Sequence, residues 1–143
     1  MFVREATMQD AFAICNISCD DLGYDCSCEF VATRISNLDN GRERVFVAEV
    51  NGIVVGYIHA EKYETLYFEP MLNVLGLAVS SKFRRCGIGR MLLNRTESWA
   101  KEVGITKIRL NSGASRKEAH SFYRAMGYNN EKGQIRFIKD LES

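Results

Sequence analysis

A short run of arginines and glycines has the residue types that bind phosphate. It reads Arg84-Arg85-Cys86-Gly87-Ile88-Gly89-Arg90. Glycines let a backbone turn tightly and approach a ligand closely, and arginines supply charged, forked donors. An apolar run that indicates a buried strand, residues 74–79, precedes it, and a helical pattern follows from Met91. Because the first N–H groups of a helix are unpaired and lie at its partially positive end, the pattern predicts a site for a pyrophosphate-bearing cofactor.

Other phosphate-binding motifs fit this run less well. No Gly-Lys-Ser/Thr closes it, which excludes a nucleotide P-loop. The G-x-G-x-x-G fingerprint of dinucleotide sites is incomplete, and no acidic ribose partner is evident. A plain strand-to-helix turn with solvated arginines remains the alternative.

Size and composition favour one ordinary domain covering residues 1–143. The chain has 143 residues, of which 46% are apolar and 26% charged, and its net charge is +1. This balance gives no general attraction to nucleic acid, and no apolar run reaches transmembrane length. The N-terminus has no signal-peptide pattern, so we expect a cytoplasmic protein with neither nucleic acid nor membrane as a partner.

The chain has five cysteines, at positions 15, 19, 26, 28 and 86. The spacings C-x3-C and C-x-C differ from the paired C-x2-C of zinc modules, and no histidine lies nearby. We therefore expect reduced thiols and no metal site.

Hydrophobic periodicity and turn residues predict the elements that position the glycine run. Strands are expected at 2–5, 45–50, 53–63, 74–79, 108–111 and 134–139. Helices are expected from Thr7 to about 18, around 30–40, from 88 to 102, and from a Ser115–Glu118 capping box to 126. Asn51-Gly52 predicts a hairpin turn. The order predicts one α/β domain with a mixed sheet and about four helices.

Two motifs at this separation are similar to those of the GNAT-type N-acetyltransferases. The family signature Q/R-x-x-G-x-G/A matches Arg84, Gly87 and Gly89. A second signature, A-x-x-F-Y-x-x-x-G-F/Y, is matched by Ala119, Phe122, Tyr123, Gly127 and Tyr128. The order of elements also resembles this family over nearly the whole chain.

The resemblance implies an acetyl-CoA site. In this family the fourth strand splays from the fifth, and the pantetheine arm pairs with the exposed backbone as an added strand does. The implied acetyl-CoA-binding residues are Leu77, Ala78, Val79, Arg84, Arg85, Cys86, Gly87, Ile88, Gly89, Arg90, Ser112, Arg116 and Phe122. An N–H near Leu77 would polarise the thioester carbonyl, with Gly76 as a bulge that directs it.

Catalytic roles follow from the same resemblance. Tyr123 matches the general acid that protonates the leaving CoA thiolate. Many members carry a glutamate base where this chain has Asn73, so the base is left open. His59 and the carboxylates Glu61, Glu64 and Glu69 are the alternatives near the expected acceptor cleft, each weighed against a structural or surface role. His120 is interpreted as a partly exposed helix residue.

The resemblance implies an acetyl-CoA-dependent N-acetyltransferase. The acetyl group would pass to a primary amine of a small molecule or peptide by direct attack in a ternary complex. The alternative is an acyl-CoA-binding regulatory module without turnover. The sequence names neither the acceptor amine nor the oligomeric state, for which a homodimer is one option.

Overall fold

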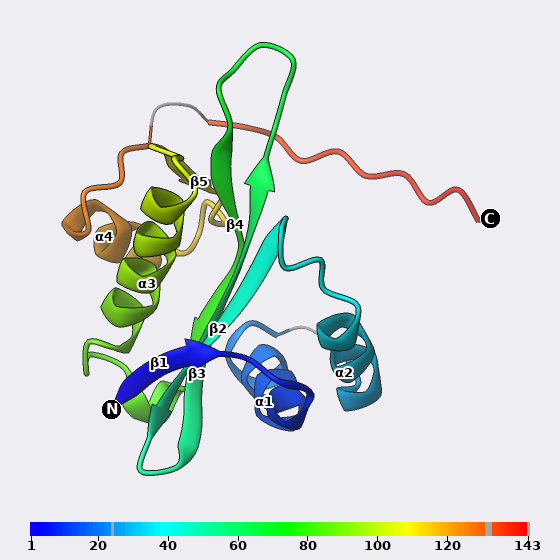
Figure 1. Ribbon diagram of the computed structural model, residues 1–143, viewed down its shortest axis with the longest axis vertical. Helices are drawn as coiled ribbons and strands as arrows, with labels where there is room; N and C mark the ends of the chain where they lie inside the picture. Colours follow the sequence, from blue (N-terminus) through cyan, green and yellow to red (C-terminus); the bar gives the residue numbers. More distant parts are fainter. Residues whose placement is uncertain (24, 131–132, 143) are drawn as a thin grey trace. The chain divides into compact units, whose positions relative to one another are not determined.

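In the part of the chain that the structure describes, five strands form one mixed sheet (Figure 1). The structure is a computed structural model, and it describes residues 1–23, 25–130 and 133–142. Two compact units make up the chain, residues 1–111 and 112–143. The strands are β1 (Phe2–Glu5), β2 (Glu43–Val50), β3 (Ile53–Tyr63), β4 (Met71–Val79) and β5 (Ile108–Leu110). They lie in this order across the sheet, and only β4 and β5 are parallel, which confirms the mixed sheet.

Helices cover both faces of this sheet, as Figure 1 shows for the first unit. The helices of this unit are α1 (Ala11–Asp21), α2 (Cys28–Ser36) and α3 (Ile88–Glu102). On one face Ile14 and Ile17 of α1 pack in a buried cluster with Tyr57 and Ala78. On the opposite face α3 comes so close that a Cβ added at Gly56 would meet side chains of α3 at 3.0–3.3 Å. The α1 face and the α3 face of the sheet are therefore distinct surfaces.

The β2–β3 hairpin sets which side chains of β3 share a face. Asn51 and Gly52 at its turn have φ values of 51° and 79°, which confirms the predicted Asn-Gly turn. Side chains alternate along a strand, so Tyr57, His59 and Glu61 all lie on the α1 face. The polar side chains of His59 and Glu61 and the ring of Tyr57 therefore share the sheet surface that faces α1.

Strands β4 and β5 separate after only three residue pairs. Pairing runs from Leu72 opposite Ile108 to Val74 opposite Leu110, and stops there. The register of β4 against β3 also shifts here, with Leu75 as the extra residue of a β-bulge next to Gly76. The rest of β4, up to Val79, pairs with β3 along one edge. Along its other edge it makes no pairs with β5.

The first helix is anchored at its start. A single 3-10 turn, η1 (Met8–Asp10), precedes α1, and the Thr7 backbone N–H donates to Asp10 Oδ2 at 2.8 Å, as the predicted capping pair requires. Arg4 of β1 donates to Asp10 at 2.8 Å and to Glu49 of β2 at 3.0 Å. These contacts tie helix, edge strand and sheet together.

The described residues of the second unit form one helix, α4 (Lys117–Ala125). Its N-cap is Arg116, without a side-chain cap, so the predicted Ser115–Glu118 capping box is wrong. Its end is as predicted, because Gly127 has a φ of 91° and the Tyr128 N–H donates to the Tyr123 carbonyl at 2.9 Å.

Two further predictions about elements were wrong. The second helix ends at Ser36, before the expected 40–41. Residues 133–142, the described part of the C-terminal segment, include no strand, although one was expected at 134–139. Apolar side chains alternate there, but Ile135 and Phe137 are exposed, and alternation forms a strand only where a neighbouring backbone supplies hydrogen bonds.

Candidate active site

The arginine–glycine run forms the connection into α3, as predicted. A 3-10 turn, η2 (Ser81–Phe83), follows β4, and the chain then adopts left-handed conformations at Arg85 (φ 64°) and Gly87 (φ 82°). Gly87 is the N-cap of α3. This backbone path presents the start of α3 to solvent, where Arg85 and Arg90 are exposed.

The first amides of α3 are available to a ligand. The first helical bond is donated by Met91 N–H to the Gly87 carbonyl at 3.1 Å. Within the described ranges, the N–H groups of Ile88, Gly89 and Arg90 have no hydrogen-bond partner. Three unpaired donors at the positive end of a fifteen-residue helix suit an anionic group.

Arg84 has a partner that sequence analysis missed. Its guanidinium donates to Asp21 at the end of α1 at 3.3 Å, and the Ser81 backbone N–H donates to the same carboxylate at 3.1 Å. Asp21 therefore fixes the start of the loop to the α1 face. No motif near Asp21 could have indicated this contact, because 60 or more residues separate the partners.

The free edge of β4 exposes specific backbone groups. The Ser80 N–H donates to the Val55 carbonyl of β3 at 2.8 Å. Because hydrogen-bonding direction alternates along an antiparallel strand, Gly76 and Ala78 also face β3. Leu77 and Val79 then direct their N–H and carbonyl groups away from β3, toward the side from which β5 has diverged.

His59 stands beside this edge on the α1 face. It is the register partner of Gly76, and its Nε2 lies 2.7 Å from Glu43 Oε1 on β2. Glu43 is also 3.4 Å from Arg34 of α2. The side chains of His59 and Glu43 are 22% and 17% exposed, so the pair is shielded but reachable.

A pocket of about 200 Å³ opens next to His59, between α1, α2 and the sheet. Most of its lining is apolar, including Ile14, Val31, Ile35 and Leu38. Its polar groups include the Ser18 and Tyr57 hydroxyls, which are hydrogen-bonded to each other at 2.8 Å. The pocket therefore suits a ligand with an apolar body and a polar end near His59.

Asn73 is part of a hydrogen-bonded chain. Its Nδ2 donates to Glu61 at 3.1 Å, and its Oδ1 accepts from Arg109 at 2.8 Å. Arg109 in turn lies over the Tyr63 ring at 4.5 Å. Both polar atoms of this amide are engaged, so the residue acts as a bridge between Glu61 and Arg109.

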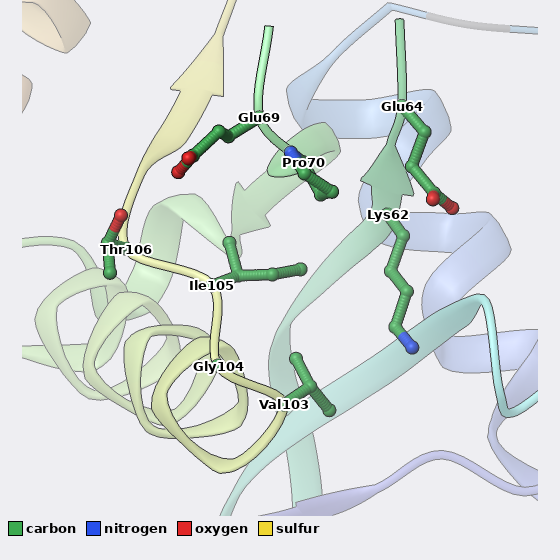
Figure 2. A pocket seen from close by; sticks show the side chains of 8 residues that line it. All are labelled: Lys62, Glu64, Glu69, Pro70, Val103, Gly104, Ile105 and Thr106. Carbon is green, nitrogen blue, oxygen red and sulfur yellow. The ribbon is translucent and has the colours of Figure 1, made fainter.

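Glu64 and Glu69 do not join His59. They line a separate cavity of about 240 Å³, together with Lys62 and residues 103–106 after α3 (Figure 2). Lys62 alternates with Glu61 along β3, which places it on the α3 face. The three carboxylates that the sequence grouped are thus divided between two sites.

The second unit contains the predicted acid. The Tyr123 ring lies 5.4 Å from Phe122 and 6.2 Å from Tyr128. Burial raises the pKa of Tyr123 above its ordinary value, and the nearby Arg116 charge acts in the opposite direction. The Ser112 hydroxyl is buried and lacks a hydrogen-bond partner among the described residues, and His120 Nε2 is 2.9 Å from the Gly113 carbonyl.

Comparison with known proteins gives the family. The model of the acetyltransferase (GNAT) family matches residues 11–128. A protein of Chlorobaculum tepidum, named as an uncharacterized N-acetyltransferase, is 30% identical over 129 residues, covering 88% of this chain and 74% of that protein. The chain belongs to the GNAT acetyltransferase family. An N-alpha-acetyltransferase of Sulfurisphaera tokodaii is 32% identical over 116 residues, covering 76% of this chain and 70% of that one.

A solved structure confirms the GNAT fold. The acetyltransferase AAC(6')-Iy, bound to a bisubstrate analog of CoA, matches with a TM-score of 0.81 at 15% identity, covering 97% of each chain. GNAT acetyltransferases use acetyl-CoA as co-substrate, so this protein is an acetyl-CoA-dependent acyltransferase. The unpaired amides at α3 and the free edge of β4 fit the pyrophosphate and the amide-rich arm of such a molecule. No helix in the described ranges has the length and hydrophobicity needed to cross a bilayer.

Proposed function

We propose that this GNAT protein transfers the acetyl group of acetyl-CoA to a primary amine of a small molecule or peptide. Donor and acceptor bind together, and the amine attacks the thioester directly. The observation that carries the proposal is the free backbone edge at Leu77 and Val79 next to the hydrogen-bonded His59–Glu43 pair. A donor site and a proton acceptor thereby adjoin each other.

The proposed donor site has two parts in the first unit. The amides of residues 85–90, with the charges of Arg85 and Arg90, hold the pyrophosphate. Leu77 and Val79 pair with the pantetheine arm, and Ala78 lies between them. From the family resemblance we keep Ser112, Arg116 and Phe122 of the second unit, and Arg84 and Cys86 of the loop, as further acetyl-CoA contacts.

The proposed chemistry needs no covalent intermediate. The neutral amine attacks the carbonyl carbon while the Leu77 N–H stabilises the developing oxyanion. The nitrogen then loses a proton to His59, which Glu43 orients, and the C–S bond breaks. Tyr123 gives its proton to the departing sulfur, so the products are the amide and CoA thiol.

The acceptor is proposed to bind in the pocket beside His59. Its largely apolar lining favours an amine with an aliphatic or aromatic body over a heavily hydroxylated one. The guanidinium of Arg34, which also lines the pocket, disfavours an ammonium ion there, so the amine binds in its neutral form. A cytoplasmic location and a homodimer stay predictions from the sequence.

A panel of amines tests this function, with acetylated products identified by mass spectrometry. We expect turnover with apolar primary amines, and a drop in kcat of about 100-fold in His59→Gln. The control is His120→Gln, which removes the other histidine, in the second unit. Binding of acetyl-CoA without transfer to any amine would contradict the function, and normal turnover in His59→Gln would refute His59 as the base.

A further inference from the structure

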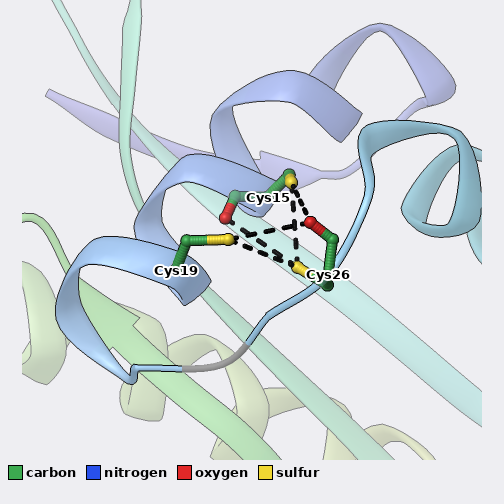
Figure 3. Close-up of side chains that lie close together, drawn as sticks. All are labelled: Cys15, Cys19 and Cys26. Atoms are coloured by element: carbon green, nitrogen blue, oxygen red, sulfur yellow. Dashed lines mark hydrogen bonds between the residues drawn. The ribbon is translucent and has the colours of Figure 1, made fainter.

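Three cysteines lie close together in space, although their spacing in the sequence does not match a zinc motif. Cys15 and Cys19 lie one turn apart on α1, and Cys26 lies in the segment that leads to α2 (Figure 3). The sulfur of Cys26 is 3.7 Å from that of Cys15 and 3.8 Å from that of Cys19. All three sulfurs lie within 4.8 Å of one another.

These separations match those of a metal-bound thiolate set. A zinc ion binds cysteine sulfur at about 2.3 Å in a tetrahedron, which places neighbouring sulfurs about 3.8 Å apart. A disulfide would bring two sulfurs to about 2.05 Å, and the cysteines here are free thiols. The two separations that involve Cys26 therefore equal those expected around a common centre, and Cys15 and Cys19 lie within 4.8 Å of each other.

Among the described residues, three thiols lie within ligand distance of one another. The Cys15 thiol also donates to the Cys26 carbonyl at 3.2 Å, which holds the segment before α2 against α1. Three thiolates leave the fourth position of a tetrahedral zinc ion to a water molecule.

We propose that Cys15, Cys19 and Cys26 form a Zn²⁺ site, with water in the fourth position. Soft thiolates select zinc among the common divalent ions. On binding, each thiol releases its proton to solvent as its sulfur bonds the ion. This differs from the expectation drawn from linear spacing, since a ligand set requires proximity in space and not a particular motif.

The ion would join α1 to the segment that leads into α2. Those two helices line the apolar pocket beside His59. Residues 11–21 and 28–36 are otherwise linked by a short connection that includes Cys26. Zinc would thus hold the acceptor side of the protein together, although the metal site itself does not depend on the proposed function.

Metal titration of the full chain tests the site. The protein is reduced, stripped with a chelator and titrated with Co²⁺ and then Zn²⁺. We expect one Co²⁺ per chain with a thiolate-to-cobalt charge-transfer band and tetrahedral d–d bands, both removed by Zn²⁺. Cys19→Ser and Cys26→Ser should weaken binding at least 100-fold, whereas Cys86→Ser, an exposed cysteine outside the cluster, should bind normally.

A second measurement uses the wild-type chain, so its result does not depend on whether the variants fold. Alkylation of the wild-type chain followed by mass spectrometry should label the partly exposed Cys19 and Cys26 after metal removal and should leave them unlabelled when Zn²⁺ is present, whereas Cys86 should be labelled in both cases. Absence of a stoichiometric Co²⁺ spectrum, or equal labelling of Cys19 and Cys26 with and without Zn²⁺, would overturn the proposal.

Discussion

Tyr123 is the residue whose environment bears most directly on its proposed role. A general acid must hold its proton at working pH, and burial raises the pKa of Tyr123 despite the opposing charge of Arg116. The motif that resembles the GNAT signature pointed to this side chain, but its local environment came only from the structure. In the proposed role, the raised pKa keeps Tyr123 protonated until the leaving thiolate takes its proton.

We predict that Tyr123→Phe lowers kcat about 100-fold or more and leaves the KM for acetyl-CoA nearly unchanged. Because the pKa is raised, wild-type kcat should not fall through loss of this proton until the pH exceeds about 10. Steady-state kinetics against pH check both points. Tyr128→Phe, which alters the neighbouring ring, is the control, and equal turnover in Tyr123→Phe would remove the assignment.

At the scale of elements, the sequence predicted those whose signals are local and missed those that depend on neighbouring segments. Periodicity predicted the bounds of α3, since both its apolar face and the Gly104 stop are local signals. The splaying of β4 from β5 also agreed with the family resemblance. The start of α4 after Arg116 and the absence of a strand at 134–139 did not follow from local sequence, because each depends on what surrounds the segment.

We predict that Gly87→Ala weakens acetyl-CoA binding about tenfold and lowers the free energy of unfolding by about 1–2 kcal/mol. A Cβ there meets no neighbour within 4 Å, so the cost arises from its φ of 82° and from the displaced amides of α3. Calorimetry and chemical denaturation measure the two effects. Gly52→Ala, at φ 79° in the hairpin turn, should lose similar stability and keep its affinity; equal loss of affinity in both variants would contradict the role of the loop.

At the scale of the whole molecule, charges join the first helix to the sheet. Arg4 contacts both Asp10 and Glu49, and hydrogen bonding with Arg4 lowers the pKa of Asp10. A depressed folded pKa means that Asp10 stabilises the fold above the pKa it has when unfolded, about 3.9, and that this stabilisation is lost as the pH falls further.

We predict that Asp10→Asn lowers the free energy of unfolding at pH 7 by about 1.5–3 kcal/mol. Wild type and variant should converge in stability as the pH falls below about 4, where the wild-type carboxylate gains a proton. Urea denaturation at a series of pH values measures this. Asp20→Asn, on the exposed side of α1, should change little at any pH, and a difference for Asp10→Asn that is constant with pH would disprove the mechanism.

The sequence alone determined most elements of the GNAT fold, the arginine–glycine run before α3 and the motif around Tyr123, because periodicity, turn residues and short spacings are local signals. Tertiary structure decided the rest of the site. The pairs His59–Glu43 and Arg84–Asp21, and the meeting of Cys15 with Cys26, join residues from separate elements. Which side chains meet across elements depends on strand register and helix packing, which no local pattern encodes.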